Sequence, residues 1–173
     1  KIDFTITDEN LSIGGPKTKY KANIDAIKLL KQLEHENRFA SAEEQKVLAK
    51  YVGWGGLKNA FENFHDDWKK ENAELKALLT EKEYPSAVTS VLDAYYTSPR
   101  IIESIYTVLE NNGFNGGRIL EPAMGIGNFF GKMPEEMRKN SQLYGVEIDS
   151  ISGRIAKELY QNGGTVKKGD LLG

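Results

Sequence analysis

Residues that could do chemistry gather in the run ILEPAMGIGNFF, residues 119–130, where an apolar stretch meets an acid and then a glycine turn. Gly125 and Gly127 allow tight or positive-φ backbone conformations, and the first N–H groups of a following helix are free to point at a ligand. Such a turn is typical of sites for nucleotide-like molecules. A carboxylate at Glu121 would repel a pyrophosphate, but it can hold an ammonium group, directly or through water.

Two further acids end the next two apolar runs, and each suits one part of S-adenosylmethionine. Glu147 comes twenty residues after the glycine turn, a spacing at which a carboxylate accepts hydrogen bonds from ribose hydroxyls, and Ile148 can cover the adenine ring. Asp170 can accept from the exocyclic amine of adenine, with Leu171 as an apolar wall. One surface acid is usually just solvated. Three acids at successive strand ends, Glu121 among them, predict a site for S-adenosylmethionine.

Short apolar runs alternate with helical patterns in this half of the chain, which predicts an α/β structure. We expect strands at 118–121, 143–147 and 165–168, with helices after Gly127 and after Ser150. A further helix has Ser98 as its cap and Pro99 at its first position, and it ends at Gly113. This alternation implies parallel strands with right-handed crossovers, whose carboxyl ends bind ligands. The three acids are therefore expected to face one crevice.

The first half of the chain is predicted to be helical. Residues 1–19 have no clear period and are expected to form an irregular or mobile arm, followed by a helical region at 20–94. We expect helices at 20–36, at 57–64 and from 66 onward. Two capping boxes, Ser41 with Glu44 and Thr80 with Glu83, start others, the first running to residue 51.

The loop YVGWGG, residues 51–56, allows two interpretations. Aromatic side chains among glycines can form a stacking surface for unpaired bases. A buried tryptophan that braces a tight turn is the favoured alternative, because aromatic residues bury most of their area in cores and glycines commonly just turn the chain.

The composition suits one ordinary domain, or a core with a smaller satellite, since 39% of the 173 residues are hydrophobic. A net charge of -2 gives no overall attraction to nucleic acid. The chain has no cysteine, which fits a reducing compartment, and no apolar run near the roughly 20 residues of a membrane span. We expect a cytoplasmic protein without membrane contact. His35 and His65 lack ligand-like spacing, so we assign no metal and no catalytic residue.

Four motifs, taken in order, resemble the amino-terminal, cofactor-binding part of a DNA adenine methyltransferase of the class whose cofactor motifs precede its catalytic motif. YYTSP, residues 95–99, resembles the segment ahead of the first strand, where the position of Thr97 reaches the methionine carboxylate. ILEPAMGIGNF resembles the first-strand motif, YGVEID the second and KGDLL the third. The resemblance implies these cofactor-binding residues: Tyr96, Thr97, Glu121, Pro122, Ala123, Met124, Gly125, Gly127, Asn128, Phe129, Glu147, Ile148, Asp170 and Leu171.

The resemblance also implies a fold and partners. It predicts that residues 95–173 form the first half of a truncated Rossmann-like class I methyltransferase domain, with three parallel strands, incomplete at its carboxyl end. The wider chain, including YVGWGGLKNAF and SISGRIAKELY, is similar to large methylase and helicase fusion proteins of conjugative elements and phages. The expected partners are DNA, through the full-length protein, and the carboxyl-terminal remainder of the polypeptide. The first strand would be an exposed edge, open to self-association.

The family's catalytic segment, an Asn or Asp before two prolines and an aromatic residue, is missing, because all five prolines stand alone. Methyl transfer needs both reactants in position, so we expect the chain to bind cofactor without turning it over. Three alternatives stay open. The first is an NAD-binding domain, although Phe130 stands where the third fingerprint glycine would be. The others are a non-catalytic DNA- or protein-binding module on a methyltransferase-like scaffold and a protein-glutamine methyltransferase.

Overall fold

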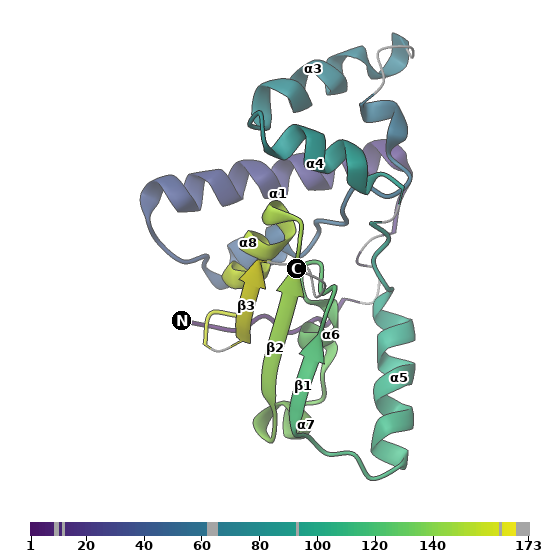
Figure 1. Ribbon diagram of the computed structural model, residues 1–173, viewed down its shortest axis with the longest axis vertical. Helices are drawn as coiled ribbons and strands as arrows, with labels where there is room; N and C mark the ends of the chain where they lie inside the picture. The colour runs from purple at the N-terminus through teal and green to yellow at the C-terminus, as the bar shows by residue number, and fades with distance from the viewer. Residues whose placement is uncertain (9–10, 12, 62–65, 93, 163, 169–173) are drawn as a thin grey trace.

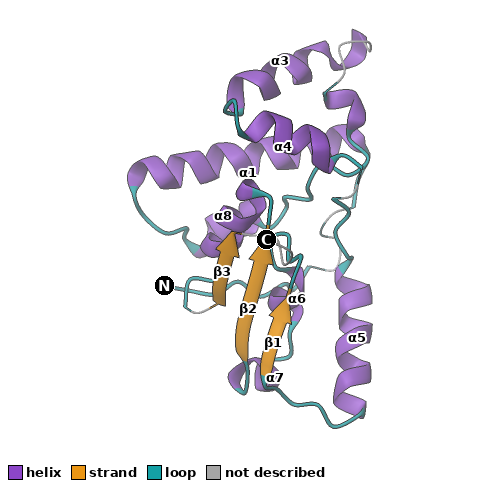
Figure 2. Cartoon of the chain, viewed as in Figure 1, coloured by secondary structure: helices purple, strands orange, loops and turns teal. Residues whose placement is uncertain are grey.

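The computed structural model describes residues 1–8, 11, 13–61, 66–92, 94–162 and 164–168, the last of these by their backbone alone. Within these ranges the chain forms an amino-terminal group of helices and a small parallel sheet with helices beside it (Figures 1 and 2). The strands point with their carboxyl ends toward the long helix α1 (Pro16–Glu36) (Figure 1). The loops at the strand ends therefore face the helical region.

The first two helices begin where the sequence provides a suitable first turn. α1 begins at Pro16, before the predicted start at residue 20, because the N–H that proline lacks would be unpaired at this position anyway. It ends where Asn37 takes a left-handed φ of 50°. The predicted capping box of Ser41 and Glu44 is confirmed, since each side chain accepts from the other's backbone N–H. It starts α2 (Ala42–Leu48), which ends earlier than predicted.

The next segment contains shorter helical turns than the sequence indicates. η1 (Lys58–Ala60) and η2 (Asp66–Trp68) are single 3-10 turns, and α3 (Lys69–Leu78) follows the second. The helix predicted at 57–64 is thus only a 3-10 turn in its first part, and residues 62–65 lie outside the described ranges. The predicted pairing of Thr80 with Glu83 is confirmed, with backbone-to-side-chain bonds of 2.9 and 3.2 Å in the two directions. The pair closes the turn that leads into α4 (Glu83–Ser90), whose N-cap position is Lys82.

The parallel sheet has the order β1-β2-β3 and agrees with the predicted strand positions to within one residue. Its strands are β1 (Arg118–Glu121), β2 (Gln142–Glu147) and β3 (Gly164–Lys168). β1 lies at an edge, with α5 (Pro99–Asn111) beside it (Figure 1). α6 (Asn128–Lys132) and α7 (Glu135–Lys139) lead to β2, and α8 (Ser150–Leu159) leads to β3. The sequence did not predict α7.

The predicted fold class needs correction. A truncated Rossmann-like class I methyltransferase domain with three parallel strands does not describe this chain, because its described residues are mostly helical and the sheet is a minor part of them. Only two parallel strands, β1 and β2, are described with their side chains. The prediction failed because a Rossmann-like domain is built around its sheet, whereas here helices from both halves of the chain supply most of the packing. The class is better stated as a largely helical α/β arrangement.

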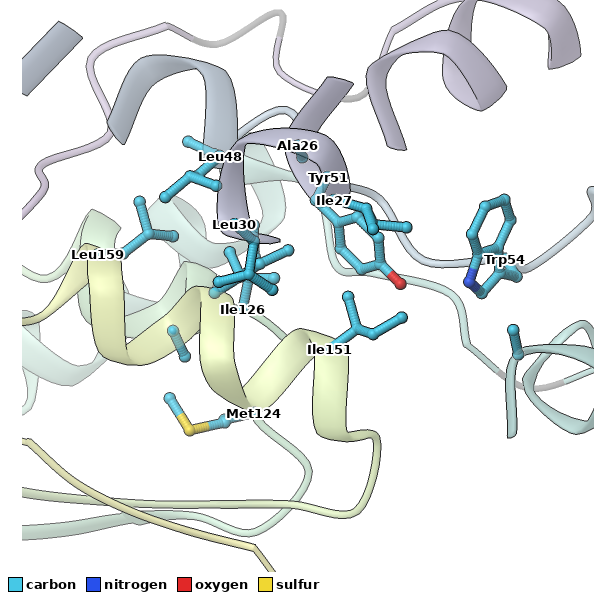
Figure 3. Close-up of a cluster of buried hydrophobic side chains, with 14 of the residues drawn as sticks. Ala26, Ile27, Leu30, Leu48, Tyr51, Trp54, Met124, Ile126, Ile151 and Leu159 are labelled. Carbon is cyan, nitrogen blue, oxygen red and sulfur yellow. The ribbon is translucent and has the colours of Figure 1, made fainter. Parts of the chain in front are cut away.

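One hydrophobic core joins the helical region to the sheet. Figure 3 shows Ile27 and Leu30 of α1 facing Ile151 and Leu159 of α8, with Tyr51 between the two groups. All of these side chains are buried. The border expected near residue 95 is therefore crossed by continuous packing, so the helical region helps to fix the position of the strand-end loops.

The amino-terminal arm is irregular but attached to the sheet helices. The Phe4 N–H donates to the Leu159 carbonyl at 2.7 Å, and the Ile6 N–H donates to the Gly131 carbonyl at 2.8 Å. Asp3 forms an isolated antiparallel bridge with Tyr160. These bonds fix residues 3–6 against α6 and α8. Among the helices that the structure describes, none is long and apolar enough to cross a membrane.

Candidate ligand-binding site

A pocket of 330 Å³ lies beyond the carboxyl ends of β1 and β2, where the sheet loops meet the helical region. Its volume falls within the usual range for small-molecule sites. We call it the strand-end pocket. It is lined by Tyr51, Gly53, Ser90, Ala94, Tyr95, Tyr96, Ala123, Gly125, Glu147, Ile148, Asp149 and Ser152. Among the predicted site residues, it brings together Tyr96, Ala123, Gly125, Glu147 and Ile148.

The glycine turn has the backbone geometry that the sequence predicts. Gly125 and Gly127 take φ values of 55° and 84°, in the left-handed region that favours glycine. A Cβ at Gly125 would lie 2.9 Å from the Tyr96 ring, and one at Gly127 would lie 2.5 Å from the Tyr160 ring. Both positions therefore require glycine for two reasons, conformation and space. The turn can approach the pocket closely only because these side chains are absent.

Glu147 is held at the end of β2 by two backbone N–H groups. Gly125 donates to one carboxylate oxygen at 2.6 Å, and Asp149 donates to the other at 2.8 Å. Burial raises the pKa of Glu147, and these two hydrogen bonds oppose the rise. A carboxylate has about four lone-pair sites, so each oxygen can still accept from a ligand. The geometry is suited to receiving hydroxyl donors.

A second group of hydrogen-bonded side chains, Tyr96, Asp149 and Ser152, lines the pocket, and the sequence analysis singled out only Tyr96 of the three. The Ser152 hydroxyl donates to Asp149 Oδ2 at 2.5 Å and lies 2.8 Å from the Tyr96 hydroxyl. Asp149 also accepts from the Ser152 N–H at 2.9 Å and so caps α8. The run DSIS at 149–152 carries the signature of such a cap and could have identified both residues. These hydrogen bonds fix the Tyr96 ring against the glycine turn.

The loop at 51–56 forms a wall of the pocket, which the sequence analysis did not anticipate. Asn23 is buried within α1 and holds the loop with two hydrogen bonds, from its Nδ2 to the Gly53 carbonyl at 2.6 Å and from the Val52 N–H to its Oδ1 at 2.9 Å. Trp54 is 1% exposed. The favoured interpretation, a buried tryptophan at a tight turn, is confirmed, and Trp54 is not a stacking surface for bases.

Glu121 does not share a pocket with Glu147. It lines a separate hollow of 590 Å³ between β1 and α5, together with apolar residues such as Ile119 and Phe129. The register explains the separation, because Glu121 pairs with Gly145 and β1 therefore ends two residues short of Glu147. Burial raises the pKa of Glu121 to about 8, and the charge of Glu147 acts in the same direction. Its Oε2 is buried and has no hydrogen-bond partner among the described residues.

The remaining predicted site residues are spread around the turn. Pro122 and Phe129 line the hollow of Glu121, and Ala123 lines both cavities. Met124 is buried beneath the turn, and half-buried Asn128 begins α6. Half-buried Thr97 is not among the lining residues of either cavity. Asp170 and Leu171 lie outside the described residues, so the structure places only two of the three predicted acids.

Of the two histidines, only His35 is among the described residues, and it does not line the strand-end pocket. His35 is exposed in the last turn of α1, and His65 lies outside the described residues. Within the described ranges, no three histidine, aspartate or glutamate side chains are grouped so that they could hold a metal ion. The strand-end pocket is therefore characterised by two carboxylates, three tyrosines and a glycine turn.

The chain was also compared with known proteins. No protein family, no curated protein and no solved structure matches it.

Proposed function

We propose that the strand-end pocket binds S-adenosylmethionine and that the chain is the cofactor-binding part of a DNA adenine methyltransferase. The observation that carries the proposal is the convergence of Tyr96, Ala123, Gly125, Glu147 and Ile148 on one pocket. These residues come from three of the motifs that resemble such enzymes. The order of the motifs supports adenine as the methyl acceptor, and the acceptor rests on that resemblance alone.

The residues present fit the proposed cofactor in charge and shape. Glu147 and Asp149 line the pocket, and none of its lining residues is basic. Two carboxylates favour a ligand that carries ammonium and sulfonium charges over one that carries a pyrophosphate. The buried Tyr51 hydroxyl has no partner among the described residues and can serve a polar ligand. The negative charge thus favours S-adenosylmethionine over NAD.

Each lining residue has a separate task in this proposal. The free lone pairs of Glu147 accept from the ribose hydroxyls, while Ile148, which is 66% exposed, covers one face of adenine. The glycine turn lets the backbone approach the amino-acid end of the ligand. We no longer assign the ammonium group to Glu121, because its carboxylate lines the other hollow.

Turnover requires more than this pocket. Bound S-adenosylmethionine would supply an electrophilic methyl group to an adenine amine, with a thioether as the leaving group and loss of one proton from the methylated amine. The chain has no Asn- or Asp-Pro-Pro segment to position that amine. We therefore propose that the chain binds cofactor and that the target base is held by another segment or partner. The cytoplasmic location stays a prediction of the sequence.

Calorimetric titration tests the proposal directly. We expect the chain to bind S-adenosylmethionine more tightly than NAD, and more tightly than S-adenosylhomocysteine, which lacks the sulfonium charge. Glu147→Gln should weaken binding, whereas Glu136→Gln, a change in an exposed residue of α7, should leave it unaltered. Tighter binding of NAD than of S-adenosylmethionine would contradict the proposal, as would equal affinities of Glu147→Gln and Glu136→Gln for S-adenosylmethionine.

The acceptor needs its own experiment. A longer protein that contains a catalytic segment should transfer labelled methyl groups to adenine in duplex DNA. Transfer only to a glutamine side chain of a protein would move the assignment to that class. Cofactor binding without transfer to either would favour a non-catalytic module.

A further inference from the structure

Tyr51 is the one lining residue of the strand-end pocket, among those described, whose buried hydroxyl has no hydrogen-bond partner. Its ring is 1% exposed and is fixed by edge contacts with Trp54 and a tilted contact with Tyr96, at centroid distances of 6.4 and 6.3 Å. Figure 3 shows the ring directed from the core toward Ile151 at the start of α8, with the hydroxyl at its far end. The ring contacts therefore hold the hydroxyl in place, and it makes no hydrogen bond with another described residue.

An unpaired buried hydroxyl destabilises the folded protein, and such groups are rare in native structures. The neighbouring polar groups are already engaged with one another. Ser152 donates to Asp149 and is bonded to Tyr96, while Glu147 accepts from two backbone N–H groups. The position of Tyr51 in the lining of a pocket indicates that its partner comes with a ligand.

The chemistry of that partner follows from the state of the phenol. Burial raises the pKa of Tyr51 well above its ordinary value, the charges of Asp149 and Glu147 act in the same direction, and the nearby Ser152 hydroxyl opposes the rise. The hydroxyl therefore stays protonated at neutral pH and is available as a neutral donor. A matching ligand must present an oxygen or nitrogen acceptor at this wall of the pocket.

We propose that the Tyr51 hydroxyl donates a hydrogen bond to an acceptor atom of S-adenosylmethionine, so that the helical region is part of the cofactor site. This inference rests on the proposed function and adds a residue that no motif in the second half of the chain contains. The loop at 51–56 is then a binding element, positioned by Asn23 of α1 through Gly53 and Val52. Ligand binding is thereby coupled to the packing of α1 against the strand-end loops.

A pair of matched substitutions separates this role from a structural one. Tyr51→Phe removes a hydroxyl without a partner, whereas Tyr20→Phe removes one that donates to the Glu71 carbonyl at 2.7 Å and does not line the pocket. Both rings are buried, at 1% and 4% exposure. The urea midpoint of the free protein and the dissociation constant for S-adenosylmethionine are measured for both variants and the wild type.

We expect Tyr51→Phe to keep or raise the urea midpoint while weakening binding between about twofold and about tenfold, the value of one hydrogen bond. Tyr20→Phe should lower the midpoint and leave the dissociation constant unchanged. If Tyr51→Phe binds S-adenosylmethionine as tightly as the wild type, this inference is overturned while the proposed function stands. The same holds if the urea midpoint of Tyr51→Phe falls as far as that of Tyr20→Phe. Failure of the wild type to bind would instead defeat the proposed function, and this inference with it.

Discussion

Replacing Glu121 with glutamine should make the protein more stable in alkali, and the effect should vanish in acid. Burial and the charge of Glu147 raise the pKa of Glu121 to about 8 in the folded state, from 4.5 for an ordinary glutamate. Between these values the folded protein retains a proton that the unfolded chain loses. The contribution of Glu121 to stability is therefore fully present below pH 4.5 and is lost as the pH rises toward 8, by about 1.4 kcal/mol for each unit.

The full loss across this window is about 5 kcal/mol, and entry of water into the hollow would reduce it. Glutamine has a similar shape and no charge, so Glu121→Gln should match the wild type near pH 5 and exceed it by several kcal/mol near pH 8. Urea unfolding, followed by the fluorescence of the buried residues Trp54 and Trp68, measures the stability of the wild type and of the variant at each pH. Glu81→Gln, on an exposed residue, is the control. Parallel pH profiles for wild type and Glu121→Gln would refute the reasoning.

Three other perturbations address the rest of the structure. Burial raises the pKa of Glu83, but hydrogen bonds from the Thr80 N–H, Lys31 and Arg154 hold it at about 2. Glu83 therefore contributes about 3 kcal/mol to the free energy of unfolding above pH 4.5, and this contribution is lost as the pH falls toward 2. Glu83→Gln should remove this acid sensitivity in a circular dichroism titration. Gly125→Ala should abolish cofactor binding in calorimetry, whereas Gly113→Ala, with a φ of 82° and nothing nearby, should cost only about 1 kcal/mol of stability. Gly55→Ala would overlap the Ala94 carbonyl oxygen and should weaken binding without altering the pH profile set by Glu121.

Local signals account for the elements that the sequence placed correctly. β1 is a short apolar run bounded by a glycine pair and a glycine turn, and the structure has it at the predicted residues. The two capping boxes form because their partners are three residues apart and need nothing from elsewhere in the chain. The glycine turn, likewise, takes the positive φ values that its composition favours. Each of these features depends on a few neighbouring residues.

Long-range packing decided what the sequence analysis missed. The loop at 51–56 reaches the pocket because Asn23, near the middle of α1, bonds to it across thirty residues, and no local pattern marks that asparagine. The direction of Glu121 depends on the register of β1 against β2. The expectation that strand-end acids converge was thus wrong for Glu121, since strand ends in one sheet need not be level.

The two cavities beside the glycine turn divide the chemistry between them. The strand-end pocket has two carboxylates that are stabilised by hydrogen bonds, whereas the hollow of Glu121 is lined mainly by apolar residues, and burial raises the pKa of its single acid to about 8. Ala123 belongs to both linings, so the turn is the partition between a polar and an apolar space. A charged ligand on one side and an uncharged, apolar one on the other would match this division.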